Sequence, residues 1–271
     1  MGLLLHSGRA ALARLALFLL LLRAMCPFCQ AASVKPFIDE TLARTGETLT
    51  SPLRLDGNSA LWAGGLAAGG LLVYSADGQI RHTFSKNHSG LNDSLASVFE
   101  KFGNGGYEMG LLGVYSGLCY VFHGREGLRT SVLALESFAA ANAAGTLVKY
   151  TAGRARPYSD QGKGIFRPYK MKTAYTSFPS GHTTSAFAIA SVFARRCESP
   201  WIGVSVYALA TGTALQRVYG DKHWASDVFA GAALGTAVGR WVAAPRNGAP
   251  SAMLLPVYER GYAGAAAVIP F

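Results

Sequence analysis

Three short stretches decide the fold and the chemistry expected of this chain: KYTAGRARP at residues 149–157, SFPSGH at residues 177–182 and RVYGDKHWASD at residues 217–227. Together they hold several cationic side chains, two histidines, a carboxylate and a Pro-Ser-Gly turn. Arg and Lys neutralise and hydrogen-bond the charged oxygens of a phosphate group. A Ser-Gly turn that opens a helix adds backbone N–H donors at the positive end of the helix dipole. The three stretches therefore predict a site that binds a phosphate group and acts on it.

The third stretch contains a histidine and a carboxylate that are four residues apart, His223 and Asp227. On a helix this spacing places both side chains on one face. Asp227 would then fix the tautomer of His223 and make its ring a better nucleophile. The spacing therefore predicts His223 as the residue that attacks the substrate.

The three stretches resemble the motifs of the PAP2 superfamily, the type 2 phosphatidic acid phosphatase family. Those motifs are Lys, six residues and Arg-Pro, then Pro-Ser-Gly-His, then Ser-Arg, five residues, His, three residues and Asp. The resemblance covers roughly residues 149–239 and departs from the pattern once, because Gln216 stands where the family usually has Ser. That Ser is peripheral to the chemistry, so the departure bears on fine tuning more than on activity.

The resemblance implies an all-α helical bundle of the PAP2/haloperoxidase type, with a phosphohistidine mechanism that needs no cofactor. His223 would attack phosphorus, Asp227 would orient it, and His182 would protonate the leaving oxygen. Five further residues would bind the phosphoryl oxygens: Lys149, Arg156, Ser180, Gly181 and Arg217. Arg154 is a weaker candidate, for which we expect a solvated side chain.

The composition favours closely packed helices or a membrane protein. Half of the residues are hydrophobic, only 15% are charged, and the net charge is +10. A basic surface suits an anionic lipid or another anionic substrate, whereas scattered Lys and Arg without a basic helix disfavour nucleic acid as a partner. No paired carboxylates stand near the three stretches, so no metal site is predicted.

The chain is predicted to hold one helical domain between two short terminal segments. Residues 1–31 have the pattern of a secretory signal peptide, with an apolar run at residues 15–22 after two arginines; a retained membrane anchor is the alternative. Residues 32–243 would form the helical phosphatase domain. Residues 244–271 would form a β-hairpin or a tail.

Apolar segments with small residues at helical spacing, such as Gly231, Gly235 and Gly239, predict helices that approach one another closely. Most apolar runs are shorter than about 18 residues, so each alone is a marginal membrane span. The pattern is thus compatible with a bundle embedded in a membrane. A disulfide between Cys119 and Cys197 is possible in an oxidising compartment, although two buried thiols are expected.

The resulting expectation is an exported, membrane-associated phosphatase that hydrolyses a phosphate monoester or a pyrophosphate, of a lipid or of a small ester. Its active site would face the periplasmic or extracytoplasmic side. Three alternatives remain: a soluble periplasmic acid phosphatase of the same superfamily, a vanadium-dependent haloperoxidase, and a non-catalytic lipid-binding protein. The complete set of motif residues disfavours the non-catalytic alternative.

Overall fold

The computed structural model describes residues 57–244 except 124 and 198, and residues 253–259 and 262–268. The predicted signal peptide at residues 1–31 lies outside the described residues. The side chain of Cys119 does as well, so the two thiols expected for Cys119 and Cys197 stay an expectation, with the disulfide as the alternative.

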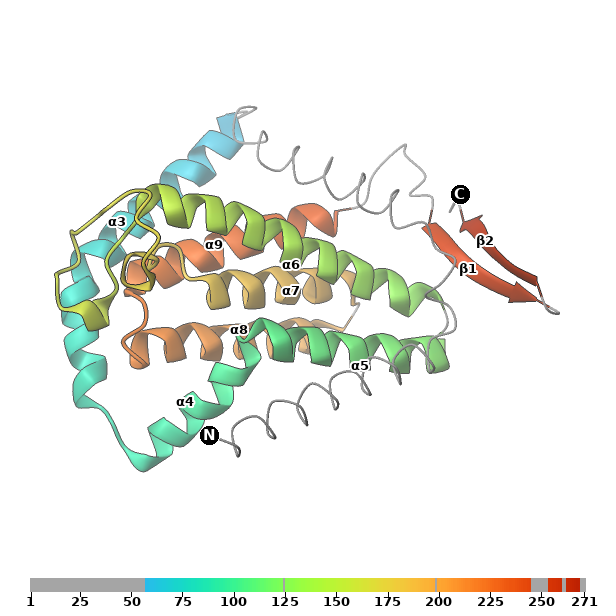
Figure 1. Cartoon of the computed structure of the whole chain (residues 1–271), viewed down its shortest axis with the longest axis horizontal. Coiled ribbons are helices and arrows are strands. Elements are labelled where there is room, and N and C mark those ends of the chain that lie inside the picture. The colour runs from blue at the N-terminus through green and yellow to red at the C-terminus, as the bar shows by residue number, and fades with distance from the viewer. Residues whose placement is uncertain (1–56, 124, 198, 245–252, 260–261, 269–271) are drawn as a thin grey trace, which may run out of the picture. The chain divides into compact units, whose positions relative to one another are not determined.

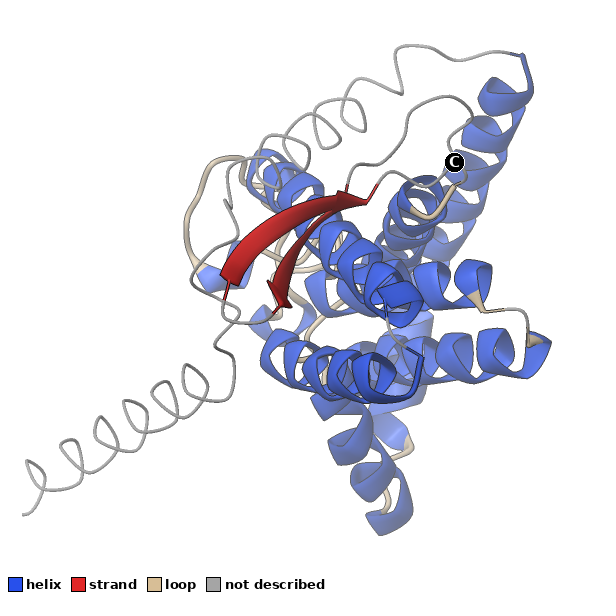
Figure 2. Cartoon of the chain, turned by 90° about the vertical axis from the view of Figure 1, so that its right-hand side faces the viewer, coloured by secondary structure: helices blue, strands red, loops and turns tan. Residues whose placement is uncertain are grey.

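The predicted all-α bundle is confirmed for the unit that spans residues 41–245. Its longer helices are α3 (Gly57–Lys86), α4 (Gly90–Phe102), α5 (Gly105–His123), α6 (Arg125–Ala152), α7 (Gly181–Arg196), α8 (Pro200–Tyr219) and α9 (Ala225–Val242) (Figure 1). Two short 3₁₀ helices, η3 (Pro157–Ser159) and η4 (Thr173–Tyr175), interrupt the loop between α6 and α7. Apart from an isolated β-bridge between Arg154 and Phe166, the described secondary structure of this unit is helical (Figure 2).

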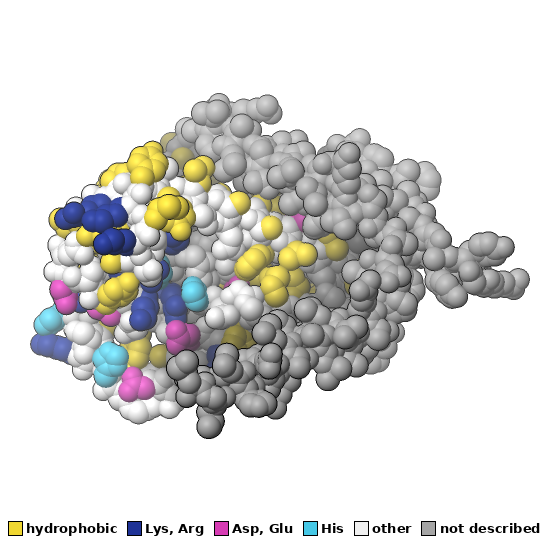
Figure 3. All heavy atoms as spheres, viewed as in Figure 1, with side chains coloured by type: hydrophobic (Ala, Val, Ile, Leu, Met, Phe, Trp, Pro, Cys, Tyr) yellow, Lys and Arg dark blue, Asp and Glu magenta, His cyan; other side chains and the backbone are white. Residues whose placement is uncertain are grey.

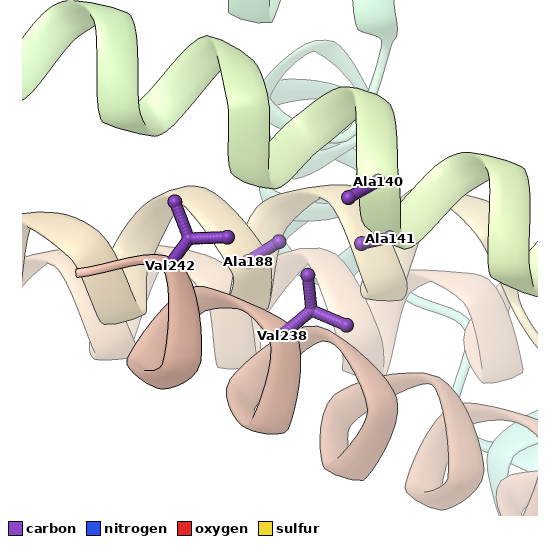
Figure 4. Close-up of a cluster of buried hydrophobic side chains, with 5 residues drawn as sticks. All are labelled: Ala140, Ala141, Ala188, Val238 and Val242. Carbon is purple, nitrogen blue, oxygen red and sulfur yellow. The ribbon is translucent and has the colours of Figure 1, made fainter. Parts of the chain in front are cut away.

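Helix α7 lies at the centre of the bundle and packs against α6, α8 and α9. One core cluster joins α6, α7 and α9 through small and branched side chains that point toward one another: Ala140, Ala141, Ala188, Val238 and Val242 (Figure 4). Alanine side chains let helix backbones come close, so this core is made of short side chains in tight contact.

The predicted close approach of helices is clearest between α7 and α9. A Cβ atom on Gly235 of α9 would collide with the backbone carbonyl oxygen of Thr184 in α7. Only glycine fits at such a contact. The contact packs the first turn of α7, which carries the end of the second stretch, against the middle of α9.

The ends of α7, α8 and α9 position the second and third stretches. Ser180 precedes α7 in an extended conformation, and Pro200 opens α8, where its missing N–H costs no hydrogen bond. Gly220 ends α8. The chain then turns within four residues into α9, which places the third stretch at the junction of two helices.

One described segment, Leu128–Ala152 within α6, is long and apolar enough to cross a membrane, judged by length and composition alone. Of its apolar window, 44% is buried within the protein. The core helix of a soluble protein would pass the same test.

The second unit contains strands β1 (Met253–Glu259) and β2 (Tyr262–Val268). They pair antiparallel, with Met253 opposite Val268 and Glu259 opposite Tyr262. The residues that join them are outside the described part, so the hairpin or tail expected for residues 244–271 stays an expectation.

Candidate active site

The three sequence stretches meet at one end of the bundle. Lys149 lies in the last turn of α6 and Arg217 in the last turn of α8, while His182 and Asp227 lie in the first turns of α7 and α9. The Lys149 ammonium donates to the carbonyl oxygens of Thr176 (3.0 Å) and Pro179 (2.6 Å). The bundle thus brings two helix C-termini and two helix N-termini together around the predicted residues.

His223 is buried, with 3% of its surface exposed, and one hydrogen bond fixes its tautomer. Its Nδ1 atom lies 2.6 Å from the carbonyl oxygen of Ser177. A carbonyl oxygen only accepts, so Nδ1 carries the proton and the lone pair resides on Nε2. This is the tautomer that a nucleophilic histidine requires.

Asp227 does not hold His223 by a direct hydrogen bond, because its carboxylate lies 3.9 Å from Nδ1. Instead it accepts from the Ser177 hydroxyl at 2.5 Å and from the Trp224 backbone N–H at 2.9 Å. Ser177 therefore stands between the two residues: its hydroxyl binds Asp227 and its carbonyl binds His223. The orienting effect expected of Asp227 reaches the histidine through this serine.

Burial and neighbouring charges keep both histidines neutral at pH 7. Burial lowers the pKa of His223 to about 4, an effect that Asp227 opposes and that Arg156 and Lys149 reinforce. Burial, with the charge of Arg217 and the nearby His223, lowers the pKa of His182 to about 4. A bound phosphate dianion would offset these positive charges, so His182 would gain a proton mainly when substrate is present.

Asp227 is a carboxylate at neutral pH. Burial by itself raises its pKa, but the nearby His223, the Arg154 guanidinium and the hydrogen bond from Ser177 outweigh burial and hold the pKa below its ordinary value. The neighbours of Asp227 therefore stabilise its buried negative charge.

The solvated side chain expected for Arg154 is wrong, because Arg154 is 1% exposed. Its Nη1 atom donates to Asp227 Oδ1 (2.5 Å) and to Ser226 Oγ (2.8 Å), and its Nη2 atom to Asp77 Oδ2 (2.8 Å). Its Nε atom donates to the Lys163 carbonyl oxygen at 3.1 Å. Every guanidinium nitrogen thus has a partner within the protein, and Arg154 is structural.

Arg156, two residues further on, has the opposite environment. Its Nη2 atom makes long contacts to the carbonyl oxygen (3.4 Å) and the hydroxyl (3.2 Å) of Thr176. Its Nε atom is buried and has no hydrogen-bond partner among the described residues. Buried donors are rarely left unpaired, so this N–H is free for an anion that enters the site.

Arg217 is held from two sides. Its Nε atom donates to Gln216 Oε1 at 2.5 Å, and its Nη2 atom donates to Glu100 Oε1 in α4 at 3.0 Å. The departure from the family pattern at Gln216 therefore has a visible consequence, since the glutamine accepts a hydrogen bond from the neighbouring Arg217.

Ser180 and Gly181 open α7 beside these cations. The Ser180 hydroxyl accepts a hydrogen bond from Thr183 (2.9 Å) and so keeps its own proton available to an acceptor. The Ser180 backbone N–H donates to the carbonyl oxygen of Asp227 (3.0 Å), which ties the start of α7 to the start of α9.

Sequence reasoning missed three residues that support the site: Asp77 in α3, Glu100 in α4 and Ser177 in the loop. Asp77 carried a weak signal, as an acidic residue directly after an apolar helical segment. Glu100 carried none, whereas Ser177 stands in the second stretch but was assigned no role there. Among the described residues, no group of three or more His, Cys, Asp or Glu side chains could hold a metal ion.

Part of the chain is similar to known proteins. The family model of the PAP2 superfamily matches residues 130–248. A lipid A 1-phosphatase of Porphyromonas gingivalis is 42% identical over 93 residues, which is 34% of this chain and 18% of that protein. A lipid A 1-phosphatase of Rhizobium johnstonii is 40% identical over 91 residues, which is 33% of this chain and 36% of that protein. The matched part is thus well under half the length of either relative.

A solved structure shares the fold. It is the crystal structure of the first transmembrane PAP2 type phosphatidylglycerolphosphate phosphatase from Bacillus subtilis, with 20% sequence identity and a TM-score of 0.51. The likeness covers 66% of this chain and 92% of that one. The residues that match the PAP2 superfamily model, 130–248, contain all three sequence stretches.

Proposed function

We propose that this chain is a phosphatase that hydrolyses the phosphate monoester or pyrophosphate group of a lipid. The observation that carries the proposal is a buried, unpartnered donor on Arg156 close to a neutral His223 whose Nε2 lone pair is free. A buried N–H without an acceptor favours the binding of an anion. If that anion is a phosphate, the neutral imidazole beside it can attack phosphorus.

The reaction proceeds in two steps. In the first, His223 Nε2 attacks phosphorus, the bond from phosphorus to the leaving oxygen breaks, and His182 gives that oxygen a proton. In the second, His182 takes a proton from water, the water oxygen attacks phosphorus, and the phosphorus–nitrogen bond breaks. Inorganic phosphate leaves, and both histidines return to their starting states.

Negative charge on the phosphoryl oxygens is stabilised by the cations around the two histidines, here called the clamp: Lys149, Arg156 and Arg217. Arg156 offers its free Nε–H, Arg217 the donors that Gln216 and Glu100 leave open, and Lys149 its ammonium group. The hydroxyl of Ser180 and the backbone N–H of Gly181 add donors at the positive end of α7. All of these groups are fixed before the substrate arrives, which limits the reorganisation that the reaction requires.

Several exposed apolar faces support a lipid substrate and association with a membrane. Side chains of α3, α5 and α8 with at least half of their surface exposed include Leu61, Trp62, Leu71, Leu72, Leu111, Val114, Leu118, Trp201 and Val204. So many exposed apolar side chains are unusual for a soluble monomer. This observation favours a membrane enzyme over the soluble acid phosphatase.

An apolar cavity of about 220 Å³ gives further support. It lies between α5, α7 and α8, and on α7 its lining runs from Ala186, one helical turn beyond His182, to Phe193. The one charged residue in the lining is the buried Glu108 of α5. A cavity of this character beside the proposed general acid suits the alkyl part of an amphiphile. An exported enzyme with its site on the extracytoplasmic side fits the signal-like sequence at residues 1–31.

The experiment is a substrate comparison with the purified chain in detergent. Because the relatives matched are named lipid A 1-phosphatases, lipid A is the first substrate to test, followed by phosphatidate, phosphatidylglycerophosphate, a polyprenyl pyrophosphate and p-nitrophenyl phosphate. Phosphate release from lipids with kcat/KM above that for p-nitrophenyl phosphate supports the proposal. A preference for the soluble ester would favour the acid phosphatase instead, and no release from any of them would contradict phosphatase activity.

A further inference from the structure

The loop between the first two sequence stretches carries an unusual surface. Residues 161–176, here called the basic loop, include Lys163, Arg167, Lys170 and Lys172 and no acidic residue. Three apolar side chains on the same loop face outward: Phe166 is 47% exposed, Tyr169 75% and Met171 78%. Figure 3 shows Lys and Arg side chains (dark blue) beside hydrophobic ones (yellow) at the left end of the view.

The backbone holds this loop in place. Ala155 donates to the Ile165 carbonyl oxygen (2.9 Å), Arg167 to the Gly153 carbonyl oxygen (2.7 Å), and the Tyr169 N–H to the last turn of α6 at 2.8 Å. Tyr169 also has a positive φ of 60°, a conformation that is uncommon for a bulky residue and persists where it is fixed by its surroundings. The exposed apolar side chains are therefore presented by a fixed loop.

The cations of the basic loop have no acidic partner among the described residues. Lys163 donates to backbone carbonyl oxygens of α3, and Arg167 and Lys170 lie 5.4 and 4.7 Å from the ring centre of Tyr175. Carbonyl and aromatic contacts leave the positive charges uncompensated. Cations interleaved with exposed aromatic and apolar residues suit an anionic lipid surface, where the charges meet phosphates and the apolar side chains enter the interface.

We propose that the basic loop docks the catalytic end of the bundle onto an anionic membrane surface. The end of the loop is joined to the site, because the Arg156 N–H donates to the Ala174 carbonyl oxygen at 2.8 Å. Contact of the loop with the membrane would therefore bring lipid phosphates to the clamp. That the basic loop guides substrate to the site rests on the proposed function, whereas the contact between the loop and the membrane does not.

Limited trypsin digestion tests the contact without any need for activity. The full chain is placed in nanodiscs of phosphatidylglycerol or of phosphatidylcholine, and cleavage after Lys170 and Lys172 is followed by mass spectrometry. Each cation near an anionic surface contributes about 1 kcal/mol, so we expect cleavage at least about tenfold slower in phosphatidylglycerol, with the protection lost at high salt. Equal cleavage rates in the two lipids would overturn the proposal.

Steady-state kinetics test whether the membrane contact affects turnover. In mixed micelles, anionic lipid should lower the wild-type KM for a lipid phosphate. Lys170→Gln/Lys172→Gln should remove this effect and leave turnover of p-nitrophenyl phosphate unchanged, while the control Lys86→Gln/Lys101→Gln, which removes two exposed charges elsewhere, should keep it. If the wild type is inactive on every ester, the proposed function fails while the digestion result still decides the contact.

A second observation carries an independent inference about α3, a helix outside the matched family region. Asp77 of α3 is fully buried and binds three donors: the Arg154 guanidinium (2.8 Å), the Ser226 backbone N–H (2.9 Å) and the Ser226 hydroxyl (2.6 Å). One turn further along α3, Arg81 forms a two-point ion pair with Asp221, at 2.7 and 2.8 Å. Helix α3 thus holds both sides of the turn that carries His223.

We infer that Asp77 is a positioning residue for His223. The links run from Asp77 to Arg154, from Arg154 to Asp227, and from Asp227 through Ser177 to the Nδ1 atom of His223. Loss of the Asp77 charge would let Arg154 move away from Asp227, and the carboxylate would then hold Ser177 less firmly. The His223 ring would then tilt, and its Nε2 lone pair would point less directly at phosphorus.

Asp77→Asn tests this inference, because the amide keeps the shape and removes the charge. We expect kcat to fall about ten- to hundredfold, the scale typical of outer-sphere partners, with KM nearly unchanged. In combination with Asp227→Asn the two losses should be far from additive, since both act on one chain of contacts. Asp93→Asn, which removes an exposed carboxylate of α4, is the control.

Thermal unfolding separates positioning from simple structural support. A folded Asp77→Asn protein with wild-type kcat, or losses that add with those of Asp227→Asn, would overturn the inference. Asp77→Glu, assayed well below its unfolding midpoint, should recover part of kcat if the carboxylate acts on Arg154.

Discussion

Arg154 and Arg156 stand two residues apart in one stretch and occupy two different regions of the molecule. Arg154 lies in a closed network with Asp77, Ser226 and Asp227, where each of its nitrogens has a partner. Arg156 lies in an open clamp with an unpartnered Nε–H. The comparison teaches that residue type does not separate a structural arginine from a substrate-binding one. An arginine is available to a ligand only where the protein leaves some of its N–H donors without acceptors.

His223 stands between the two regions, with Nδ1 on the network side and Nε2 free, so its removal should have the largest effect. We expect His223→Ala to lower kcat by about a thousandfold or more, because the variant lacks the Nε2 atom that would attack phosphorus. Phosphate release from the folded variant is the measurement. His82→Ala, which removes an exposed histidine of α3, should keep wild-type activity, and more than about a tenth of wild-type activity in His223→Ala would contradict the nucleophile assignment.

Breaking the closed network should cost stability. Arg154→Met leaves two buried carboxylates without their cation, and the removal of one partner from a buried ion pair typically costs about 3–5 kcal/mol. We therefore expect a large drop in the free energy of unfolding, measured by denaturant titration in detergent. An unfolding midpoint equal to that of the wild type would show that the network does not stabilise the fold.

Altering the open clamp should cost activity and leave stability nearly intact. In Arg156→Lys the charge is kept, but a point-like ammonium replaces a planar fork that can bind two phosphoryl oxygens. We expect kcat/KM to fall about a hundredfold and binding of vanadate to weaken, with little change in unfolding. If the lysine variant matches the wild type in kcat/KM, Arg156 is not a two-point clamp.

Acid should destabilise the fold through the two histidines. Both have a pKa of about 4 in the folded chain, below the ordinary value of 6.5. At these two groups the unfolded chain therefore binds protons first as the pH falls, so the stability that the two histidines contribute is fully present above pH 6.5 and is lost between pH 6.5 and about pH 4. The slope should reach about 1.4 kcal/mol per pH unit for each histidine. His182→Gln should reduce this slope, and an unchanged slope would contradict the burial of a neutral His182.

The smallest effect is expected at the one departure from the family pattern. Gln216→Ser restores the residue that the family usually has and removes the acceptor for Arg217 Nε. A hydrogen bond to a charged group contributes about 1.5–3 kcal/mol at most, and Glu100 still holds the guanidinium. We expect KM to rise a few-fold with kcat unchanged, as measured by steady-state kinetics. A fall in kcat of similar size would mean that Gln216 acts in the transition state.

The sequence by itself determined the helical nature of the bundle and predicted which residues would meet at one end of it. Local spacing carries that information: a Pro-Ser-Gly turn opens a helix, residues four apart share a helix face, and small residues at the same spacing mark close helix contacts. The position of Lys149, His182, Arg217 and Asp227 at helix ends follows from such local patterns.

Only the tertiary structure decided what surrounds those residues. Asp77 reaches Ser226 across 149 positions of the chain, and Glu100 reaches Arg217 across 117. No local spacing encodes such contacts, because they depend on how α3 and α4 pack against the ends of α8 and α9. Ser177 is a second case, because it links Asp227 to His223 where the sequence predicted a direct bond between those two residues. Arg154 is a third, because its partners Asp77 and Asp227 lie on helices far away in the sequence. A side chain's hydrogen-bond partners are set by which distant elements supply acceptors, and that is settled when the bundle packs.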